Sequence, residues 1–217
     1  MDNKKNAPRE HYYKKFKETN PAEVTKRTGI KFDSTKNRFI VESLNHELNI
    51  DWPDFKLYST GTKCPKALYE YKMEIIISRY LIEGRNVPAS NQFKAYRDLP
   101  WGELYDPNFQ GRCIMRFAHT FGYKVDKYKK AAHNLGGTPI KQSDAGYDYT
   151  FLPGIICRLL LWTPDEEFPP SAQFLFSDNI QFALNAEDLA VVGDIIIEAL
   201  SDVGDAALGV PQNAKNT

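Results

Sequence analysis

Cysteine is scarce in this sequence, which limits the metal and redox chemistry that it can carry. The 217 residues include three cysteines, Cys64, Cys113 and Cys157. They are far apart, odd in number and form no C-x-x-C pair. This pattern argues against a disulfide framework and against a self-contained zinc or iron–sulfur site.

Histidines and catalytic signatures are equally sparse. No two of the four histidines stand at metal-ligand spacing, and surface positions are the expected interpretation for them: His11, His46, His119 and His133. The chain contains no G-x-G-x-x-G, no phosphate-binding lysine loop, no H-E-x-x-H and no G-x-S-x-G. The common nucleotide-binding, zinc-protease and serine-hydrolase motifs are therefore absent.

An excess of either charge is also missing. Lys plus Arg equals Asp plus Glu at 28 each, so the formal net charge is zero. A dedicated nucleic-acid-binding protein normally needs a positive field, so we expect no nucleic-acid partner. The basic stretches 14–17 and 124–130 are broken by other residues at helical spacing, which favours solvated helix faces over a phosphate track.

Long apolar runs are lacking as well. The first fifteen residues, MDNKKNAPREHYYKK, hold no apolar run typical of a signal peptide. The longest apolar runs, near residues 75–77 and 159–162, are far too short to span a membrane. We therefore expect a cytoplasmic protein with no membrane partner.

The composition of the sequence is that of one globular domain. The 42% hydrophobic and 13% aromatic content can bury a sizeable core. Residues 1–29 predict a helical segment, with Asn20 as the cap of a second helix and Gly29 at its end. Residues 30–207 predict a single α+β domain, and residues 208–217 a flexible tail.

The domain is expected to pair a mixed or mostly antiparallel sheet with two long helices. Short strands at 30–33, 38–42, 47–51 and 55–58 read as an antiparallel meander. A central helix is predicted over 66–83, helices over 109–121 and 124–135, and a C-terminal helix capped by Asn185. Strands are predicted at 92–96, 147–152, 155–162 and 173–176; the apolar run 155–162 is typical of a strand buried on both faces.

The acidic turn after that strand is the first candidate site. Asp165, Glu166 and Glu167 are followed by Phe168 and two prolines. Adjacent carboxylates repel unless they are exposed or neutralised, so the cluster could bind a cation or basic group, or supply a general acid. The alternative, which composition alone favours, is a solvated turn.

Arg158 is the second candidate, because a charge inside an apolar strand must be paired or reach solvent. It could anchor an anionic ligand or form a structural ion pair with Glu70, Glu74 or the acidic turn. The aromatic stretch 93–109, including Phe93 and Trp101, could line a cleft for a flat ligand or simply pack in the core. Cys64, near a lysine and a helix start, lacks an adjacent histidine base, so its role stays open.

Several segments together resemble the family called domain of unknown function 3786. They are Leu159-Leu160-Leu161-Trp162, the acidic turn with Phe168-Pro169, Phe174-Leu175-Phe176, and the start of the last helix at 186–189; weaker matches are Gln92-Phe93-Lys94, Leu99-Pro100 and Leu135-Gly136-Gly137. The resemblance covers roughly residues 30–203. It implies an anaerobic setting beside iron–sulfur or corrinoid proteins, although this chain has no cysteine-rich cluster module.

Three functions remain open at this stage. The first is a non-catalytic accessory protein that binds a small molecule or cofactor of unknown identity, with an iron–sulfur or corrinoid protein as partner. The second is an enzyme using Asp165, Glu166 and Glu167 with Arg158. The third is a protein-interaction module. No metal is predicted.

Overall fold

A computed structural model of the chain describes the backbone of residues 3–206 and the side chains of residues 10–204. The described α-helices are α1 (Asn3–Lys17), α2 (Pro21–Thr28), α3 (Tyr71–Glu83), α4 (Gly102–Phe109), α5 (Arg116–Phe121), α6 (Val125–Asn134) and α7 (Ala186–Ala206). Short 3₁₀ segments are η1 (Lys66–Leu68), η2 (Tyr96–Asp98) and η4 (Asp178–Phe182), and η3 (Gln110–Met115) is a π-helix.

Two antiparallel sheets account for the strands in the described part of the chain. The first has the order β1-β2-β3-β4 and the second the order β5-β9-β8-β7-β6. The bounds are β1 (Lys31–Asp33), β2 (Arg38–Ser43), β3 (His46–Asp51), β4 (Lys56–Tyr58), β5 (Phe93–Ala95), β6 (Thr138–Ile140), β7 (Ala145–Leu152), β8 (Ile155–Trp162) and β9 (Ser171–Ser177). The predicted α+β class, the meander and the mostly antiparallel pairing are confirmed.

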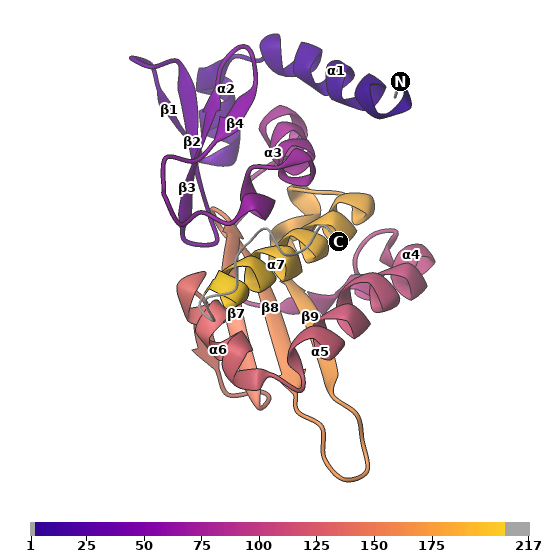
Figure 1. Ribbon diagram of the computed structural model, residues 1–217. Coiled ribbons are helices and arrows are strands. Elements are labelled where there is room, and N and C mark those ends of the chain that lie inside the picture. The colour runs from indigo at the N-terminus through magenta and orange to yellow at the C-terminus, as the bar shows by residue number, and fades with distance from the viewer. Residues whose placement is uncertain (1–2, 207–217) are drawn as a thin grey trace.

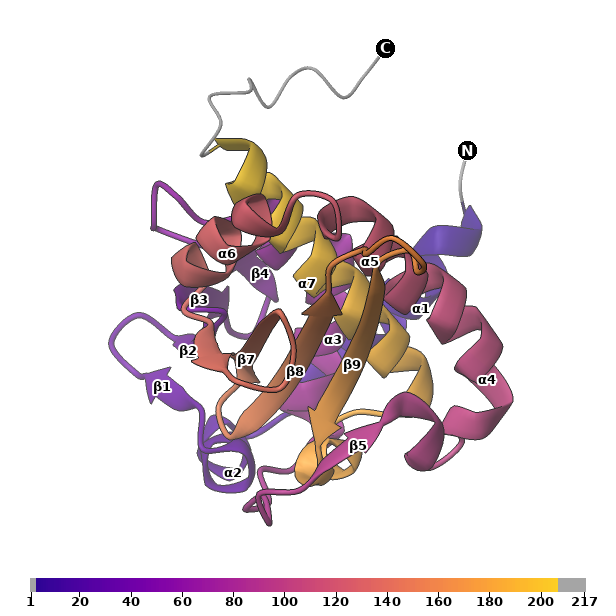
Figure 2. The same ribbon diagram turned by 90° about the horizontal axis from the view of Figure 1, so that it is seen from below.

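Helix α7 occupies the middle of the fold. It runs across one face of the five-stranded sheet, with α6 and the α4–α5 segment beside it and α3 on its far side (Figure 1). The other face of β7, β8 and β9 is not covered by helices (Figure 2). The two sheets meet where Leu44 N–H of the meander donates to Thr150 O of β7 at 2.9 Å.

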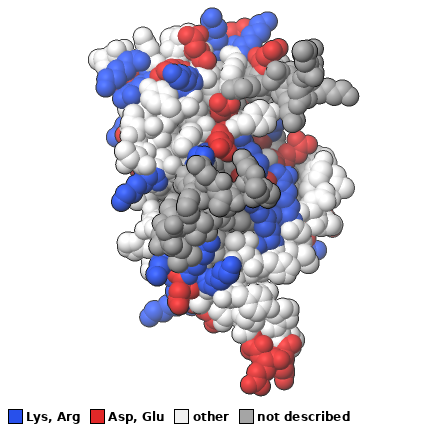
Figure 3. Space-filling model, in the orientation of Figure 1, with Lys and Arg blue, Asp and Glu red and all other residues white. Residues whose placement is uncertain are grey.

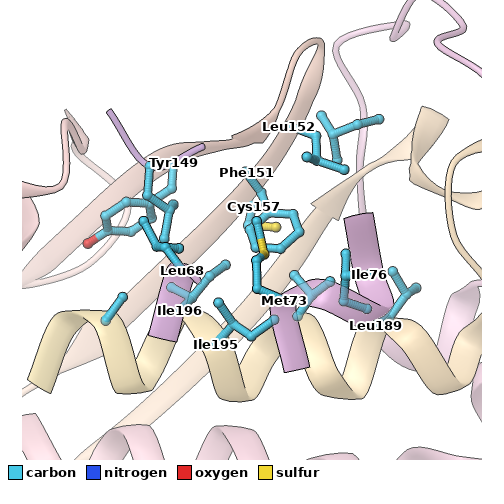
Figure 4. Packing of buried hydrophobic residues seen from close by; sticks show 14 of the residues in the cluster. Leu68, Met73, Ile76, Tyr149, Phe151, Leu152, Cys157, Leu189, Ile195 and Ile196 are labelled. Atoms are coloured by element: carbon cyan, nitrogen blue, oxygen red, sulfur yellow. The ribbon is translucent and has the colours of Figure 1, made fainter. Parts of the chain in front are cut away.

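The core lies between α7 and the sheet. Ile195 and Ile196 of α7 point toward Phe151 and Cys157 of the sheet (Figure 4), and all four side chains are fully buried. A fully buried aliphatic or aromatic side chain contributes roughly 1.5–3 kcal/mol relative to exposure. This face of α7 therefore fixes the helix against the sheet and sets where its two ends lie.

Local signals in the sequence account for several element boundaries. Asn20 accepts a hydrogen bond from Ala22 N–H at 2.9 Å, and Gly29 has the left-handed φ of 73° that ends α2. Asp188 N–H donates to Asn185 Oδ1 at 3.0 Å at the start of α7, as the cap prediction required.

Three predicted elements differ from the structure. The helix expected over 66–83 is interrupted at Tyr69 and Glu70, so η1 and α3 are separate. The helix expected from residue 109 begins earlier, at Gly102. Pro107 lies inside α4, and the π-helix η3 follows α4 directly. The central strand 155–162 is not buried on both faces: on the uncovered face Ile156, Arg158 and Trp162 are half-exposed, and Leu160 is buried.

Candidate functional site

One cavity lies near the C-terminal end of α7. It has a volume of about 540 Å³, which is within the range of small-molecule sites. It forms where β3, the 59–65 loop, and the last turns of α6 and α7 meet. Its lining residues are His46, Thr62, Lys63, Cys64, Pro65, Lys66, Tyr69, Asn134, Asp202 and Val203. We call it the Cys64 cavity.

The less exposed part of the cavity carries a thiol and an imidazole. Cys64 is half-buried, and burial raises the pKa of its thiol above the ordinary value. His46 is half-buried too, and burial lowers the pKa of its imidazole. The His46 Nε2 atom is buried and has no hydrogen-bond partner among the described residues. Both groups are therefore neutral near pH 7, and one imidazole nitrogen is available to a ligand or a water.

The rim of the cavity is polar and carries more positive than negative charge. Lys63, Lys66 and Asn134 are exposed, and Asp202 is half-buried. Tyr69 is also at the rim, and its pKa is raised first by burial and then by the charges of Cys64, Glu70 and Asp202. A ligand entering the cavity would meet two ammonium groups and several hydrogen-bonding groups before it reached the thiol.

Local turn chemistry brings these residues together. Leu44 and Asn45 both have positive φ values, 47° and 62°, so a two-residue turn places His46 at the start of β3. Ser59 Oγ donates to Glu47 O at 2.9 Å and fixes the loop that carries Cys64. The end of α6 closes the third side, because Gly136 is so near Asn45 that a Cβ there would lie 2.6 Å from the Asn45 Cβ.

A second cavity of about 340 Å³ lies at the other end of α7. Tyr12, Trp101 and Phe182 line it together with the buried ion pair between Arg79 and Asp188. We call it the Trp101 cavity. Of the aromatic stretch 93–109, Trp101 lines this cavity, whereas Tyr96 and Phe109 stack on each other in the core with ring centroids 4.2 Å apart.

Arg158 is paired, as one of the two sequence-based interpretations held, but with a different partner. Its Nε and Nη2 donate to Asp148 at 2.7 and 2.8 Å, and its guanidinium lies 3.7 Å from the centroid of the Phe93 ring. Asp148 lies directly opposite on β7 in the strand register. The prediction of Glu70, Glu74 or the acidic turn as the partner was therefore wrong. A carboxylate directly opposite on the neighbouring strand pairs with the guanidinium instead.

The acidic turn lies at the tip of the loop between β8 and β9, which extends away from the body of the molecule (Figure 1). Asp165, Glu166, Glu167 and Phe168 are all exposed, and red side chains mark this tip in Figure 3. Asp165 Oδ1 accepts the N–H groups of Glu167 and Phe168 at 2.8 and 2.7 Å, which is ordinary turn chemistry. Neither of the two cavities above includes any of these residues.

The predicted site residues therefore fall into three separate places. Arg158 and Phe93 lie together on the uncovered sheet face, Trp101 lines its own cavity, and the acidic turn is at the loop tip. Their role in ligand binding stays a prediction. The Cys64 cavity draws on residues that the sequence left unassigned to any site: His46, Tyr69, Asn134 and Asp202. Only Cys64, beside two lysines and before a helix start, offered a local signal.

A charged network joins α7 to its neighbouring helices. Asp194 receives Arg112 Nε at 2.8 Å, Arg116 Nη1 at 3.3 Å and Lys72 Nζ at 3.4 Å, and its own side chain is 4% exposed. Glu198 shares Lys72 and Arg116. Figure 3 shows blue side chains gathered beside the junction of α7 with the α4–α5 segment. The cations neutralise a buried carboxylate, so the network has a structural role.

The described part of the chain contains neither a metal-binding cluster nor a membrane-spanning helix. No group of three or more His, Cys, Asp or Glu side chains there could hold a metal ion. No helix among the described residues is long and apolar enough to cross a membrane.

Comparison with known proteins identifies a family. No curated protein and no solved structure matches the chain. One family model does match, over residues 20–199, and that span is most of the chain. The chain therefore belongs to the family described as Domain of unknown function (DUF3786).

Proposed function

We propose that this protein is a non-catalytic accessory protein that binds a small molecule in the Cys64 cavity. The observation that carries the proposal is the convergence of Cys64, His46 and a polar rim in a cavity of about 540 Å³. Ligand sites are typically concave, largely preformed and equipped with a few converging polar groups. The shifted pKa values of Cys64, His46 and Tyr69 meet in this cavity, as is typical of functional sites.

The state of the thiol favours binding over nucleophilic catalysis. A cysteine nucleophile reacts as the thiolate, which a lowered pKa or an adjacent base would favour. Burial acts in the opposite direction at Cys64 and raises the pKa of its thiol. A neutral thiol and a neutral imidazole can contact a ligand by packing and hydrogen bonding without a covalent step.

The charge at the rim indicates the class of ligand. Lys63 and Lys66 outnumber the single carboxylate of Asp202 among the lining residues. We therefore propose a small polar molecule that carries a negative group. A role beside iron–sulfur or corrinoid proteins in an anaerobe is part of the same proposal and rests on the family resemblance alone.

An enzyme built on the acidic turn and Arg158 is less well supported. Arg158 is bound to Asp148, and it stands four residues before Trp162, where β8 ends. Four residues of strand span about 13 Å, and the acidic residues lie beyond that point.

Filling the cavity tests the proposal. Val203→Trp places a large side chain in the lining, and we expect native mass spectrometry of protein purified anaerobically to show one small-molecule adduct in the wild type and none in this variant. Met115→Trp is the matched control, because Met115 is 59% exposed and does not line the cavity. An adduct retained equally by both variants, or no adduct on the wild type, would contradict the proposal.

A further inference from the structure

Four large apolar side chains are exposed at the start of α4 and on η4. Trp101 is 78% exposed, Leu104 70%, Phe182 50% and Tyr105 37%. Single exposed apolar residues are common on protein surfaces, but a group of them marks an interaction site. Trp101 and Phe182 line one cavity, and Leu104 and Tyr105 follow Trp101 in the first turn of α4. We call these four residues the Trp101 patch.

The backbone presents Trp101 in a fixed position. Its φ of 65° is left-handed, a conformation that bulky residues rarely adopt. The next residue, Gly102, donates its N–H to Leu99 O at 2.8 Å and packs directly against the Tyr96 carbonyl. The backbone that carries the exposed indole is therefore fixed by the fold, so a partner that binds it does not have to order this segment of chain.

The cavity beside Trp101 has a neutral floor. The Arg79 guanidinium pairs with Asp188 and lies 5.0 Å from the centroid of the Tyr12 ring. Asp188 is 3% exposed and the Arg79 side chain 21%, so this pair is largely shielded from water. Because the Arg79–Asp188 pair carries no net charge and aromatic rings lie beside it, the floor suits one apolar side chain better than a free ion. Glu83 also lines the cavity, and this exposed carboxylate pairs with Lys15.

The surroundings of the patch are acidic. From residue 98 to residue 109 every charged residue is a carboxylate: Asp98, Glu103 and Asp106. Glu187 is close as well, because Tyr96 donates a hydrogen bond to the neighbouring Ala186 O at 2.8 Å. Two cations are also near: Arg97 precedes this segment in the sequence, and exposed Arg85 donates its backbone N–H to Phe182 O at 2.9 Å. The four carboxylates outnumber these two cations. Charge complementarity therefore selects a basic partner.

We propose that the Trp101 patch is a docking surface for a partner-protein segment with an apolar anchor flanked by Lys or Arg. The anchor fills the Trp101 cavity, and the basic flanks face the carboxylates. The patch continues beyond the cavity onto Leu104 and Tyr105, which a small ligand would leave uncovered. Trp, Tyr and Arg are also the residues that dominate binding energy at interfaces.

This inference is independent of ligand binding at the Cys64 cavity. The two cavities are lined from opposite ends of α7, by Asp188 and by Asp202. Fourteen helical residues separate these positions by about 21 Å.

Two synthetic peptides test the inference by fluorescence polarisation. The basic probe has the sequence Lys-Lys-Leu-Trp-Lys-Lys, and its counterpart replaces every Lys with Glu. We expect saturable binding of the basic probe at concentrations below about 1 mM and at least about tenfold weaker binding of the acidic probe. Trp101→Ser and Glu103→Lys should each weaken the basic probe, Trp101→Ser by about tenfold.

Control variants keep the result interpretable. Leu104→Ser repeats the test at a second exposed position, and Val203→Trp in the Cys64 cavity should leave peptide binding unchanged. Equal affinity for both peptides, no binding of the basic one, or no effect of Trp101→Ser and Leu104→Ser would overturn the inference. Sedimentation that shows self-association abolished by Trp101→Ser would also overturn it, because the occupant would then be a second copy of this chain.

Discussion

Asp194→Asn is expected to destabilise the protein by about 2–4 kcal/mol. The Asp194 side chain is 4% exposed and receives Arg112, Arg116 and Lys72, which come from three different elements. Neutralising it leaves three cations facing an amide. The cations are 38–47% exposed and can turn toward water. The decrease in the free energy of unfolding should therefore lie at or below the range that is usual for a broken buried ion pair. Urea unfolding followed by circular dichroism measures it.

Glu198→Gln is the matched control for this prediction. Glu198 contacts Lys72 and Arg116 but is 31% exposed. Partly exposed ion pairs contribute about 0–1 kcal/mol, so this variant should unfold at nearly the wild-type urea concentration. Equal losses in the two variants would show that burial of Asp194 does not determine the strength of the network.

Gly102→Ala is expected to destabilise the protein by about 3 kcal/mol, at the upper end of the usual cost of overpacking, because a methyl group at this position overlaps the backbone. A Cβ on Gly102 would collide with the Tyr96 carbonyl oxygen, which cannot move without shifting η2 and the start of α4. The same shift would displace Trp101. Thermal unfolding monitored by circular dichroism should therefore show a large loss, together with a change in Trp101 fluorescence.

Gly111→Ala separates this steric effect from general effects of glycine replacement. Gly111 lies in η3 with open space where a Cβ would stand. Replacing a helical glycine without a clash stabilises a protein by about 0.4–1 kcal/mol. If Gly102→Ala were as stable as Gly111→Ala, the packing of Gly102 against Tyr96 would not be what positions Trp101.

Local patterns in the sequence predict much of the fold. The capping residues Asn20 and Asn185 mark true helix starts, and Gly29 marks a true helix end. The turns between β1 and β4 follow from polar and proline-containing segments at the expected positions. These signals succeed because they depend on residues within a few positions of each other.

The misses arise where tertiary contacts override local pattern. One helix was predicted over 66–83, but the chain breaks at Tyr69 and Glu70, and Tyr69 lines the Cys64 cavity. The helix predicted over 109–121 begins earlier, at Gly102, because α4 tolerates Pro107 near its start and continues into the π-helix η3. Arg158 needed the strand register to reveal Asp148 as its partner.

The candidate site was less predictable than the fold, because its parts are distant in the sequence. His46, Cys64, Asn134 and Asp202 come from four different segments, and no spacing rule connects them. The acidic turn was a candidate site because its carboxylates are adjacent in the sequence. Adjacent carboxylates repel each other, and an exposed loop tip is also the place that tolerates them best. No histidine lies near Cys64 in the sequence, and no local pattern indicated that His46 lines the same cavity.

The alkylation rate of Cys64 tests the central claim most directly. Cys113 and Cys157 are fully buried, so iodoacetamide should modify Cys64 alone in the folded protein, at a rate that keeps rising above pH 9 because the pKa of its thiol is raised. We predict slower modification in protein isolated anaerobically than in the same protein after unfolding, dialysis and refolding, since a bound molecule covers the thiol. Identical rates in the two samples would contradict occupancy of the Cys64 cavity.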